Sequence, residues 1–195
     1  MEYKIKVGVS NRHVHLTKED YYFLFDEELT LKYKLNQIGE FASNQTLTIK
    51  TKDGIIENVR VVGPLRKYTQ VEISRHDARR LNIKPPVRSS GDIYDSEEIT
   101  LVTNKNELTK RCCIIADRHV HMSPSDAVKY NVVDKQPVKI RVEGEKSGIM
   151  DANIKVSDTG YYEFHIDTDD ANAFDLDNND EVTLIIWVLK LEILK

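Results

Sequence analysis

Four of the chain's six histidines lie in two short runs that resemble each other. The runs are Asn11-Arg12-His13-Val14-His15-Leu16 and Asp117-Arg118-His119-Val120-His121-Met122, and their first histidines are 119 − 13 = 106 residues apart. Each run follows an apolar segment and precedes a helix-start pattern, a hydroxyl residue with an acid three positions later. A unit of strand, Arg-His-x-His and capped helix is therefore present twice.

The two histidines of each run are spaced for metal chelation. Successive side chains of a strand point to opposite faces, so His13 and His15 share a face, as do His119 and His121. Two imidazoles on one face can bind a divalent metal, zinc above all. One such pair alone is more often a pair of ordinary surface or core histidines, but two copies in matched contexts favour metal sites.

The duplication also predicts a third ligand for each pair. Aligning Val71-Glu72-Ile73-Ser74 with Phe164-His165-Ile166-Asp167 places Glu72 opposite His165. We therefore expect two sites, one formed by His13, His15 and Glu72 and the other by His119, His121 and His165. Each has three protein ligands and an open position, as catalytic zinc does, whereas structural zinc usually has four ligands.

Three arginines are candidates for binding an anion. Arg66 lies in Gly63-Pro64-Leu65-Arg66, six residues before Glu72, and the shorter counterpart of this segment in the second copy has no arginine. It could bind phosphate or a developing oxyanion, or be an ordinary solvated arginine. Arg12 and Arg118 could pair with acids or bind an anionic substrate. His76 has no counterpart in the repeat and is expected on the surface.

The composition predicts a soluble globular protein. Its 195 residues are 40% hydrophobic and 31% charged, and a net charge of −4 argues against bulk binding to nucleic acid or a membrane. The adjacent Cys112 and Cys113 are expected to be buried apolar residues, with metal binding as the alternative. The longest apolar run, Leu184 to Leu189, is shorter than the roughly 20 residues of a membrane span and predicts a final buried strand.

The expected elements are many short strands with tight turns and a few short helices. This pattern predicts a mainly β fold with short helices, made of two pseudo-symmetric small β-barrel domains that arose by internal duplication. We expect the first barrel repeat over residues 11–117 and the second over residues 118–195, with the strand in residues 1–10 able to pair with the second barrel. A repeat of this size can form its own core, and the site is expected between the copies.

The longer motifs resemble those of the propanediol-utilisation-type (PduL-type) phosphate acyltransferases, or phosphotransacylases. The similarity extends from Val7 to about Ile185. It is carried by the two histidine runs and by Asn58-Val59-Arg60-Val61-Val62-Gly63-Pro64-Leu65-Arg66, Thr69-Gln70-Val71-Glu72-Ile73-Ser74-Arg75, Pro86-Val87-Arg88-Ser89-Ser90-Gly91-Asp92 and His165-Ile166-Asp167-Thr168-Asp169.

The resemblance implies two β-barrels with two zinc ions at their junction. It implies reversible transfer of a short acyl group, acetyl or propanoyl, between coenzyme A and phosphate. The family's zinc ligands fall on the six residues proposed from the repeat, and its essential arginine falls on Arg66. On this hypothesis phosphate attacks the thioester directly, Arg66 orients it, and zinc near Glu72 stabilises the leaving thiolate. Cobalt or another divalent ion could replace zinc.

Some features depart from the family pattern. Only a few residues precede Val7, so we expect no extension that targets a microcompartment, and with no secretory signal we expect a cytoplasmic protein. Asp117 stands directly before Arg118, at a position where a small or apolar residue is expected from the resemblance. The tail, residues 187–195, lies outside the resemblance, and its apolar character makes a homodimer conceivable. The resemblance also suggests that the first strand of each repeat crosses to the other barrel.

Two other functions fit part of the pattern. In a cupin-like mononuclear metalloenzyme, His13, His15 and Glu19 would bind one metal, although Glu19 lies in a helix-cap signal and its counterpart is Ser125. A non-catalytic zinc-binding β module would instead have closed structural sites. Since no Ser-His-Asp set, Walker loop or dinucleotide fingerprint is present, the nucleophile of an enzyme could be a bound substrate.

Overall fold

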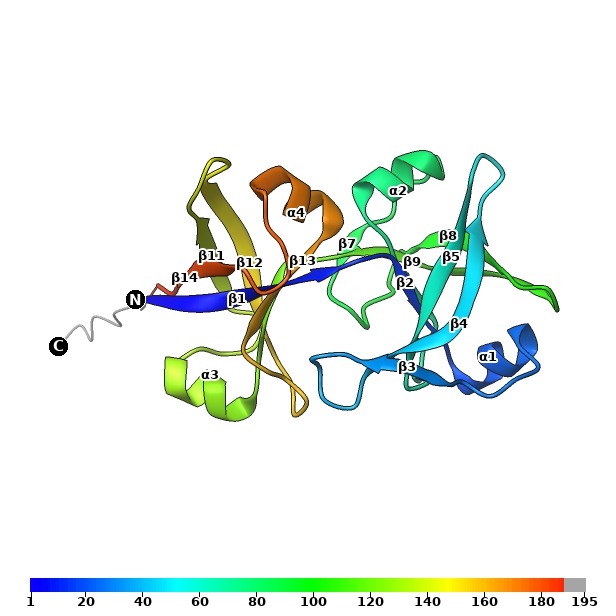
Figure 1. Ribbon diagram of the computed structural model, residues 1–195, viewed down its shortest axis with the longest axis horizontal. Coiled ribbons are helices and arrows are strands. Elements are labelled where there is room, and N and C mark those ends of the chain that lie inside the picture. Colours follow the sequence, from blue (N-terminus) through cyan, green and yellow to red (C-terminus); the bar gives the residue numbers. More distant parts are fainter. Residues whose placement is uncertain (188–195) are drawn as a thin grey trace. The chain divides into compact units, whose positions relative to one another are not determined.

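The computed structural model describes residues 1–187, which form short strands and four short helices (Figure 1). In chain order the elements are β1 (Glu2–Ser10), β2 (His13–His15), α1 (Lys18–Leu24), β3 (Leu31–Lys34), β4 (Phe41–Lys50), β5 (Ile55–Gly63), β6 (Gln70–Glu72), α2 (Arg75–Arg80), β7 (Val87–Arg88), β8 (Glu97–Val102), β9 (Glu107–Ala116), β10 (His119–Met122), α3 (Pro124–Tyr130), β11 (Pro137–Val142), β12 (Gly148–Val156), β13 (Glu163–Asp167), α4 (Thr168–Phe174) and β14 (Glu181–Ile185).

The strands form two closed six-stranded barrels, which confirms the predicted fold class. One barrel has the order β1-β13-β10-β12-β11-β14 and closes on itself. In the other, the circuit β4-β5-β2-β6-β9-β8 returns to β4, while β3 and β7 extend the sheet from β4 and β9. Closure removes the unpaired strand edges that a small open sheet would expose.

The contacts divide the chain into two compact units, each around one barrel. The histidine–glutamate unit comprises Ser10–Asp117 and Asp167–Asp169. The three-histidine unit comprises Met1–Val9, Arg118–Ile166 and, of the described residues, 170–187. That the chain has independent domains over residues 11–117 and 118–195 stays a prediction.

The first strand of each repeat belongs to the barrel of the other repeat. β1 precedes the first histidine run, yet it pairs antiparallel with β14, with Ile5 opposite Val182. β9 precedes the second run, yet it pairs with β6 and β8 in the histidine–glutamate unit. Residues 1–9 therefore complete a core to which the second repeat supplies the other strands.

Each barrel encloses its own apolar core, formed by the inward-facing residues of alternating strands. In the three-histidine unit the largest buried side chains include Phe164, Met122 and Ile140. In the histidine–glutamate unit the core contains Tyr21, the adjacent Cys112 and Cys113, and the aliphatic residues of β5 and β8. Both cysteines are free and buried, as expected for small apolar residues.

The two helix caps predicted after the histidine runs are present, and a third cap precedes α2. The side chains of Thr17, Ser74 and Ser123 each accept a hydrogen bond from the backbone N–H three residues later, and Ser123 forms a full capping box with Asp126. Each cap satisfies a backbone donor that the first helical turn leaves unpaired. These three helices begin directly after β2, β6 and β10, and α4 follows β13, so a helix follows each strand that carries a candidate ligand.

Two short strands were not predicted from the sequence, and the structure describes the last predicted strand only in part. The strands that were not predicted are β3 and β7; β3 has the alternating order Leu-Lys-Tyr-Lys, but all four of its residues are exposed. The predicted final strand over Leu184 to Leu189 is present only as far as Ile185. Its last residues and the tail from 188 onwards lie outside the described residues. Within residues 1–187, no helix is long and apolar enough to cross a membrane.

Candidate metal and anion site

The two Arg-His-x-His runs occupy matching positions in their barrels. β2 runs antiparallel to β6, with His13 opposite Glu72, and β10 runs antiparallel to β13, with His119 opposite His165. On its other side each histidine strand lies parallel to the next long strand, β5 or β12. The same register therefore brings a third possible ligand beside each histidine pair.

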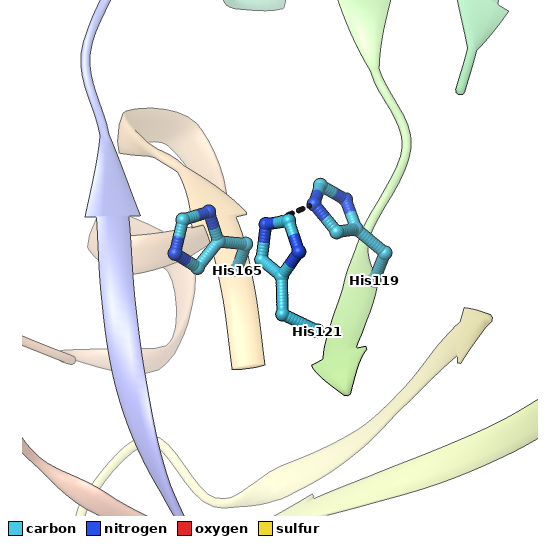
Figure 2. Close-up of side chains that lie close together, drawn as sticks. All are labelled: His119, His121 and His165. Carbon is cyan, nitrogen blue, oxygen red and sulfur yellow. Dashed lines mark hydrogen bonds between the residues drawn. The ribbon is translucent and has the colours of Figure 1, made fainter. Parts of the chain in front are cut away.

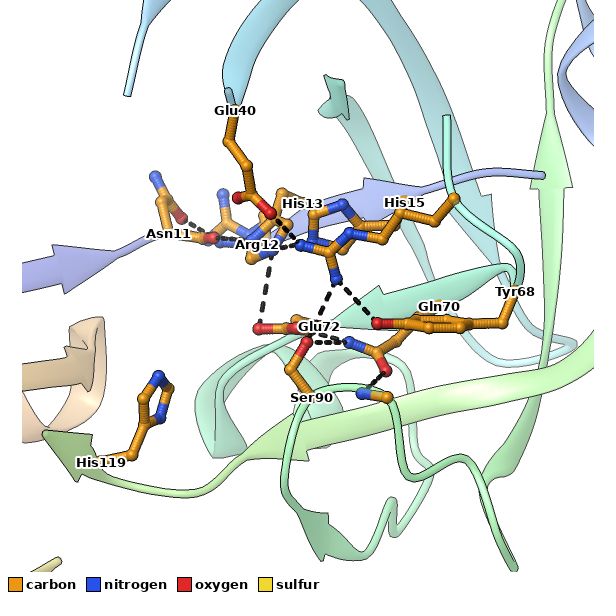
Figure 3. A network of polar contacts seen from close by, with 12 residues as sticks. Asn11, Arg12, His13, His15, Glu40, Tyr68, Gln70, Glu72, Ser90 and His119 are labelled. Carbon is orange, nitrogen blue, oxygen red and sulfur yellow. Dashed lines mark hydrogen bonds and ion pairs between the residues drawn. The ribbon is translucent and has the colours of Figure 1, made fainter. Parts of the chain in front are cut away.

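His13, His15 and Glu72 form a compact group in the histidine–glutamate unit (Figure 3). Nε2 of His13 lies 3.1 Å from Nε2 of His15 and 3.6 Å from a carboxylate oxygen of Glu72. Nδ1 of His13 lies 2.8 Å from the carbonyl oxygen of Asn11, which is the usual arrangement when the other ring nitrogen faces a metal. This group could hold a metal ion.

His119, His121 and His165 form the corresponding group in the three-histidine unit (Figure 2). Nε2 of His119 lies 3.1 Å from Nε2 of His121, the same separation as in the other pair. The ring of His165 packs edge-on against that of His121, with 4.6 Å between the ring centroids. The structure thus gathers all six residues predicted as ligands into two groups, and metal binding by them stays a prediction.

The buried histidines are suited to bind a metal because they remain neutral. Burial lowers the pKa of His15 well below its usual value, and the nearby His13 and Arg66 lower it further. Burial likewise lowers the pKa of His121, with help from His119 and His165. A neutral imidazole has a lone pair available for a metal, and a carboxylate with imidazoles is a common ligand set for zinc.

Arg66 reaches the histidine–glutamate group from the turn after β5, where the peptide bond between Gly63 and Pro64 is cis. Its backbone N–H donates to the carbonyl of Leu16, just after β2. Its side chain is only 17% exposed and forms an ion pair with Glu40. The structure therefore places a mostly buried cation close enough to His15 to affect the pKa of that ring.

Polar partners that the sequence did not single out hold Arg66 and Glu72 in place; of these, Tyr68, Gln70 and Ser90 are labelled in Figure 3. Nη1 of Arg66 donates to the hydroxyls of Tyr68 and Ser90, at 3.1 and 3.3 Å. The side-chain amide of Gln70 donates to Glu72 at 2.5 Å and to Ser90 at 2.9 Å. Gln70 and Ser90 therefore connect the arginine to the carboxylate. Both lie in segments that carried the family resemblance, although no role was assigned to them.

Arg12 and Arg118 pair with acids in equivalent ways. Arg12 Nε donates to Asp77 at 2.7 Å, and Arg118 donates to both carboxylate oxygens of Asp170 at 2.7 and 2.6 Å. In both units the arginine precedes the first histidine, and the acid lies five residues after the third candidate ligand. These contacts support a structural role, and substrate binding by the two arginines stays a prediction. His76 is exposed, as expected, and its backbone N–H donates to Asp169.

Comparison with known proteins identifies a family for this arrangement. The sequence profile of the phosphate propanoyltransferase family matches residues 6–177. The chain is 50% identical to the phosphate propanoyltransferase of Thermotoga maritima over 186 residues, covering 93% of this chain and 89% of the relative. It is 42% identical to the enzyme of that name from Shewanella putrefaciens, covering 93% and 88%, and 44% identical to that of Salmonella typhimurium, covering 89% and 85%.

Proposed function

Because the chain belongs to the phosphate propanoyltransferase family, we propose that it transfers a short acyl group reversibly between coenzyme A and phosphate, using two metal ions and Arg66. The reaction is acyl-CoA + phosphate ⇌ acyl phosphate + CoA, with acetyl and propanoyl as the candidate acyl groups. Family membership supports the reaction class. The metal ligands and the role of Arg66 rest on the geometry of the two groups.

The observation that carries the proposal is the proximity of Arg66 to a group of possible metal ligands. His13, His15 and Glu72 converge on one point, and Arg66 is held beside them by its contacts with Glu40, Tyr68 and Ser90. A positive side chain next to a divalent cation site attracts an anion. Phosphate and the developing oxyanion of acyl transfer are such anions.

The residues would act as follows. A phosphate oxygen attacks the thioester carbonyl carbon, the carbonyl π electrons move to its oxygen, and the collapse of this tetrahedral species breaks the C–S bond. Among the described residues, Glu40, Tyr68 and Ser90 use three of the five N–H donors of Arg66. We assign the others, on Nε and Nη2, to phosphate. Arg66 thereby orients the nucleophile and offsets charge on the oxyanion.

Each ligand group would hold one ion. His13, His15 and Glu72 would bind the first and His119, His121 and His165 the second, with zinc as the expected metal. A divalent ion, when bound, supplies Lewis-acid chemistry that stabilises negative charge on a leaving sulfur. Since burial keeps His15 and His121 neutral, the protein does not need to remove a proton from these rings before a metal binds.

The two other functions considered have less support. A cupin-like site requires Glu19, but Glu19 is exposed on α1, and the acid grouped with His13 and His15 is Glu72. A non-catalytic zinc module does not explain membership of a family of acyltransferases. It also gives no role to Arg66 beside the candidate metal ligands.

The test is release of free thiol from acetyl-CoA and propanoyl-CoA, with and without phosphate, by protein whose zinc content has been measured by mass spectrometry. We expect phosphate-dependent thiol release from protein with two zinc ions per chain, and the two rates will rank the acyl groups. Fully metallated protein that releases no thiol would overturn the transferase proposal. Phosphate-dependent turnover by metal-free protein would overturn only the metal assignment.

A further inference from the structure

One candidate metal group contains a carboxylate, Glu72, and the other has a carboxylate, Glu163, next to it. The strand register aligns the pairs, because His15 lies opposite Gln70 and His121 lies opposite Glu163. The next pair is His13 with Glu72 in one unit and His119 with His165 in the other. The two aligned positions are therefore Gln70 and Glu72 on β6, and Glu163 and His165 on β13.

The carboxylate of Glu163 is buried against His165. Its Oε2 lies 2.7 Å from Nε2 of His165 and accepts a hydrogen bond from the hydroxyl of Tyr161 at 2.9 Å. The Tyr161 oxygen is itself 2.7 Å from the same ring nitrogen. A β-carbon at Gly8 of β1 would collide with both Glu163 Oε2 and His165 Nε2, so the backbone of β1 encloses this contact.

The geometry also indicates which nitrogen of His165 faces a metal. Nε2 is engaged by Glu163 and Tyr161, which leaves Nδ1 for coordination. Figure 2 agrees with this, because one ring nitrogen of His165 is turned towards His121 and the other away from it. In metal sites a ligating histidine commonly donates its other N–H to a carboxylate, which fixes the tautomer and increases the basicity of the ring.

The corresponding side chain in the other unit has a different task. Gln70 is a neutral amide that donates to Glu72, and its carbonyl oxygen accepts from the backbone N–H of Gly91 at 2.8 Å. It therefore supports a carboxylate that is itself a candidate ligand. In the three-histidine unit the ligand is neutral and the supporting side chain is the carboxylate.

We propose that Glu163 is a positioning residue for the three-histidine metal site. Its carboxylate accepts the Nε2 proton of His165, directs the Nδ1 lone pair to the metal and supplies the one negative charge that Glu72 supplies in the other unit. In one unit the third ligand, Glu72, is a carboxylate and its supporting side chain, Gln70, is neutral. In the other unit the third ligand, His165, is neutral and its supporting side chain, Glu163, is a carboxylate. Each ligand and its support together thus carry one negative charge. This inference rests on the metal sites of the proposed function.

The experiment measures zinc affinity of the full chain by competition with a chelating indicator. Glu163→Gln should weaken one of the two zinc sites about 10- to 100-fold, the usual effect of losing such a partner, and leave the other unchanged. The control is Glu145→Gln, an exposed carboxylate of the same unit, which should change neither site. Tyr161→Phe should have a smaller effect, because Glu163 still accepts the proton.

The sharper variant restores the arrangement of the other unit. The double substitution Glu163→Gln with His165→Glu places the Gln and Glu of β6 on β13, and it should recover most of the affinity lost in Glu163→Gln. A residue with a merely structural role would not be rescued in this way, because the double variant departs further from the native packing. Cobalt spectra should show the same coordination number in wild type and Glu163→Gln.

Each result separates this inference from the proposed function. Two tight sites in wild type with unchanged affinity in Glu163→Gln would overturn this inference alone. A change in cobalt coordination number in that variant would also overturn it, since Glu163 would then be a direct ligand. A wild-type chain without tight metal sites would remove both this inference and the metal part of the proposed function.

Discussion

The two units have nearly the same polar framework but differ in the groups next to it. Both have an Arg-His-x-His strand, and both pair that arginine with an aspartate at an equivalent position. The third member of the group is Glu72 in one unit and His165 in the other. The histidine–glutamate unit also has Arg66, which lowers the pKa of His15, whereas the corresponding segment of the other unit has no arginine. The duplicated framework therefore supports two sites with different chemistry.

The difference is concentrated in the segment before the third ligand. In the histidine–glutamate unit this segment carries Arg66 and Tyr68, and in the other it carries Tyr161 without an arginine. Tyr68 and Tyr161 each lie four residues before the third ligand, yet Tyr68 accepts a hydrogen bond from Arg66 whereas Tyr161 contacts His165. The same hydroxyl position thus contacts the arginine of the proposed anion site in one unit and a proposed metal ligand in the other.

The largest expected effect comes from removing the arginine that distinguishes the units. Arg66→Ala should lower the rate of phosphate-dependent thiol release about 10²- to 10³-fold, as loss of an oxyanion donor does, with zinc content unchanged. Steady-state kinetics over a range of phosphate concentrations measures this effect. Lys67→Ala, which removes the neighbouring exposed cation, is the control and should keep full activity. If Arg66→Ala had the same kinetics as the wild type, Arg66 would not give the two units different functions.

The next effect concerns the equivalence of the two histidine pairs. His15→Ala and His121→Ala should each reduce the zinc content from two ions to one per chain, because each removes a ligand from one group only. Mass spectrometry after dialysis gives the count. If either variant lost both ions, the two groups would not be separate sites.

The paired arginines should differ in their contribution to stability. Asp77 is 1% exposed and the side chain of Asp170 is 17% exposed, so removing Arg12 leaves the more deeply buried charge without its partner. Arg12→Ala should therefore lower the free energy of unfolding by about 3–5 kcal/mol, and Arg118→Ala by about 1 kcal/mol. Urea unfolding followed by circular dichroism measures both, with Arg79→Ala on the surface of α2 as the control. Equal losses would contradict the difference in burial.

The smallest effect is expected at the cysteines, which are found only in the histidine–glutamate unit. Burial raises the pKa of Cys112 to about 12 and that of Cys113 well above its usual value. At pH 8 the thiolate fraction of Cys112 is therefore roughly 10⁻⁴. A thiol reagent should label neither residue in native protein and both in urea, without loss of activity before unfolding. Rapid native labelling would indicate that this barrel opens readily.

Much of this comparison can be predicted from the sequence because it depends on local patterns. Alternation places His13 and His15 on one face, and the repeat alignment places Glu72 where the other copy has His165. Hydroxyl residues with an acid three positions later correctly predicted the starts of α1, α2 and α3. Signals of this kind need only the spacing of residues along one strand or one helical turn.

The remaining parts depend on contacts that local spacing cannot encode. Glu40 and Ser90 reach Arg66 from segments that are 26 and 24 residues away in the chain. The contact of Glu163 with His165 was also not predicted, since an alternating position on a strand does not reveal which ring the side chain contacts. The apolar residues of β3 and β7 are exposed because these strands extend a barrel that is already closed.

The exchange of first strands has a consequence for how the chain is made. The barrel that contains Arg66 can close once β9 has been synthesised. β1 instead pairs with β14, so the partner of Ile5, Val182, is added only after a further 182 − 5 = 177 residues have been synthesised. At about 5–20 residues per second, translation needs roughly 9–35 s to supply that partner. Throughout this interval the apolar side chains of Ile5 and Val7 lack their final neighbours. The nascent chain thus carries β1 as an unpaired apolar strand until β14 is made, and a chaperone on the ribosome could bind it during that time.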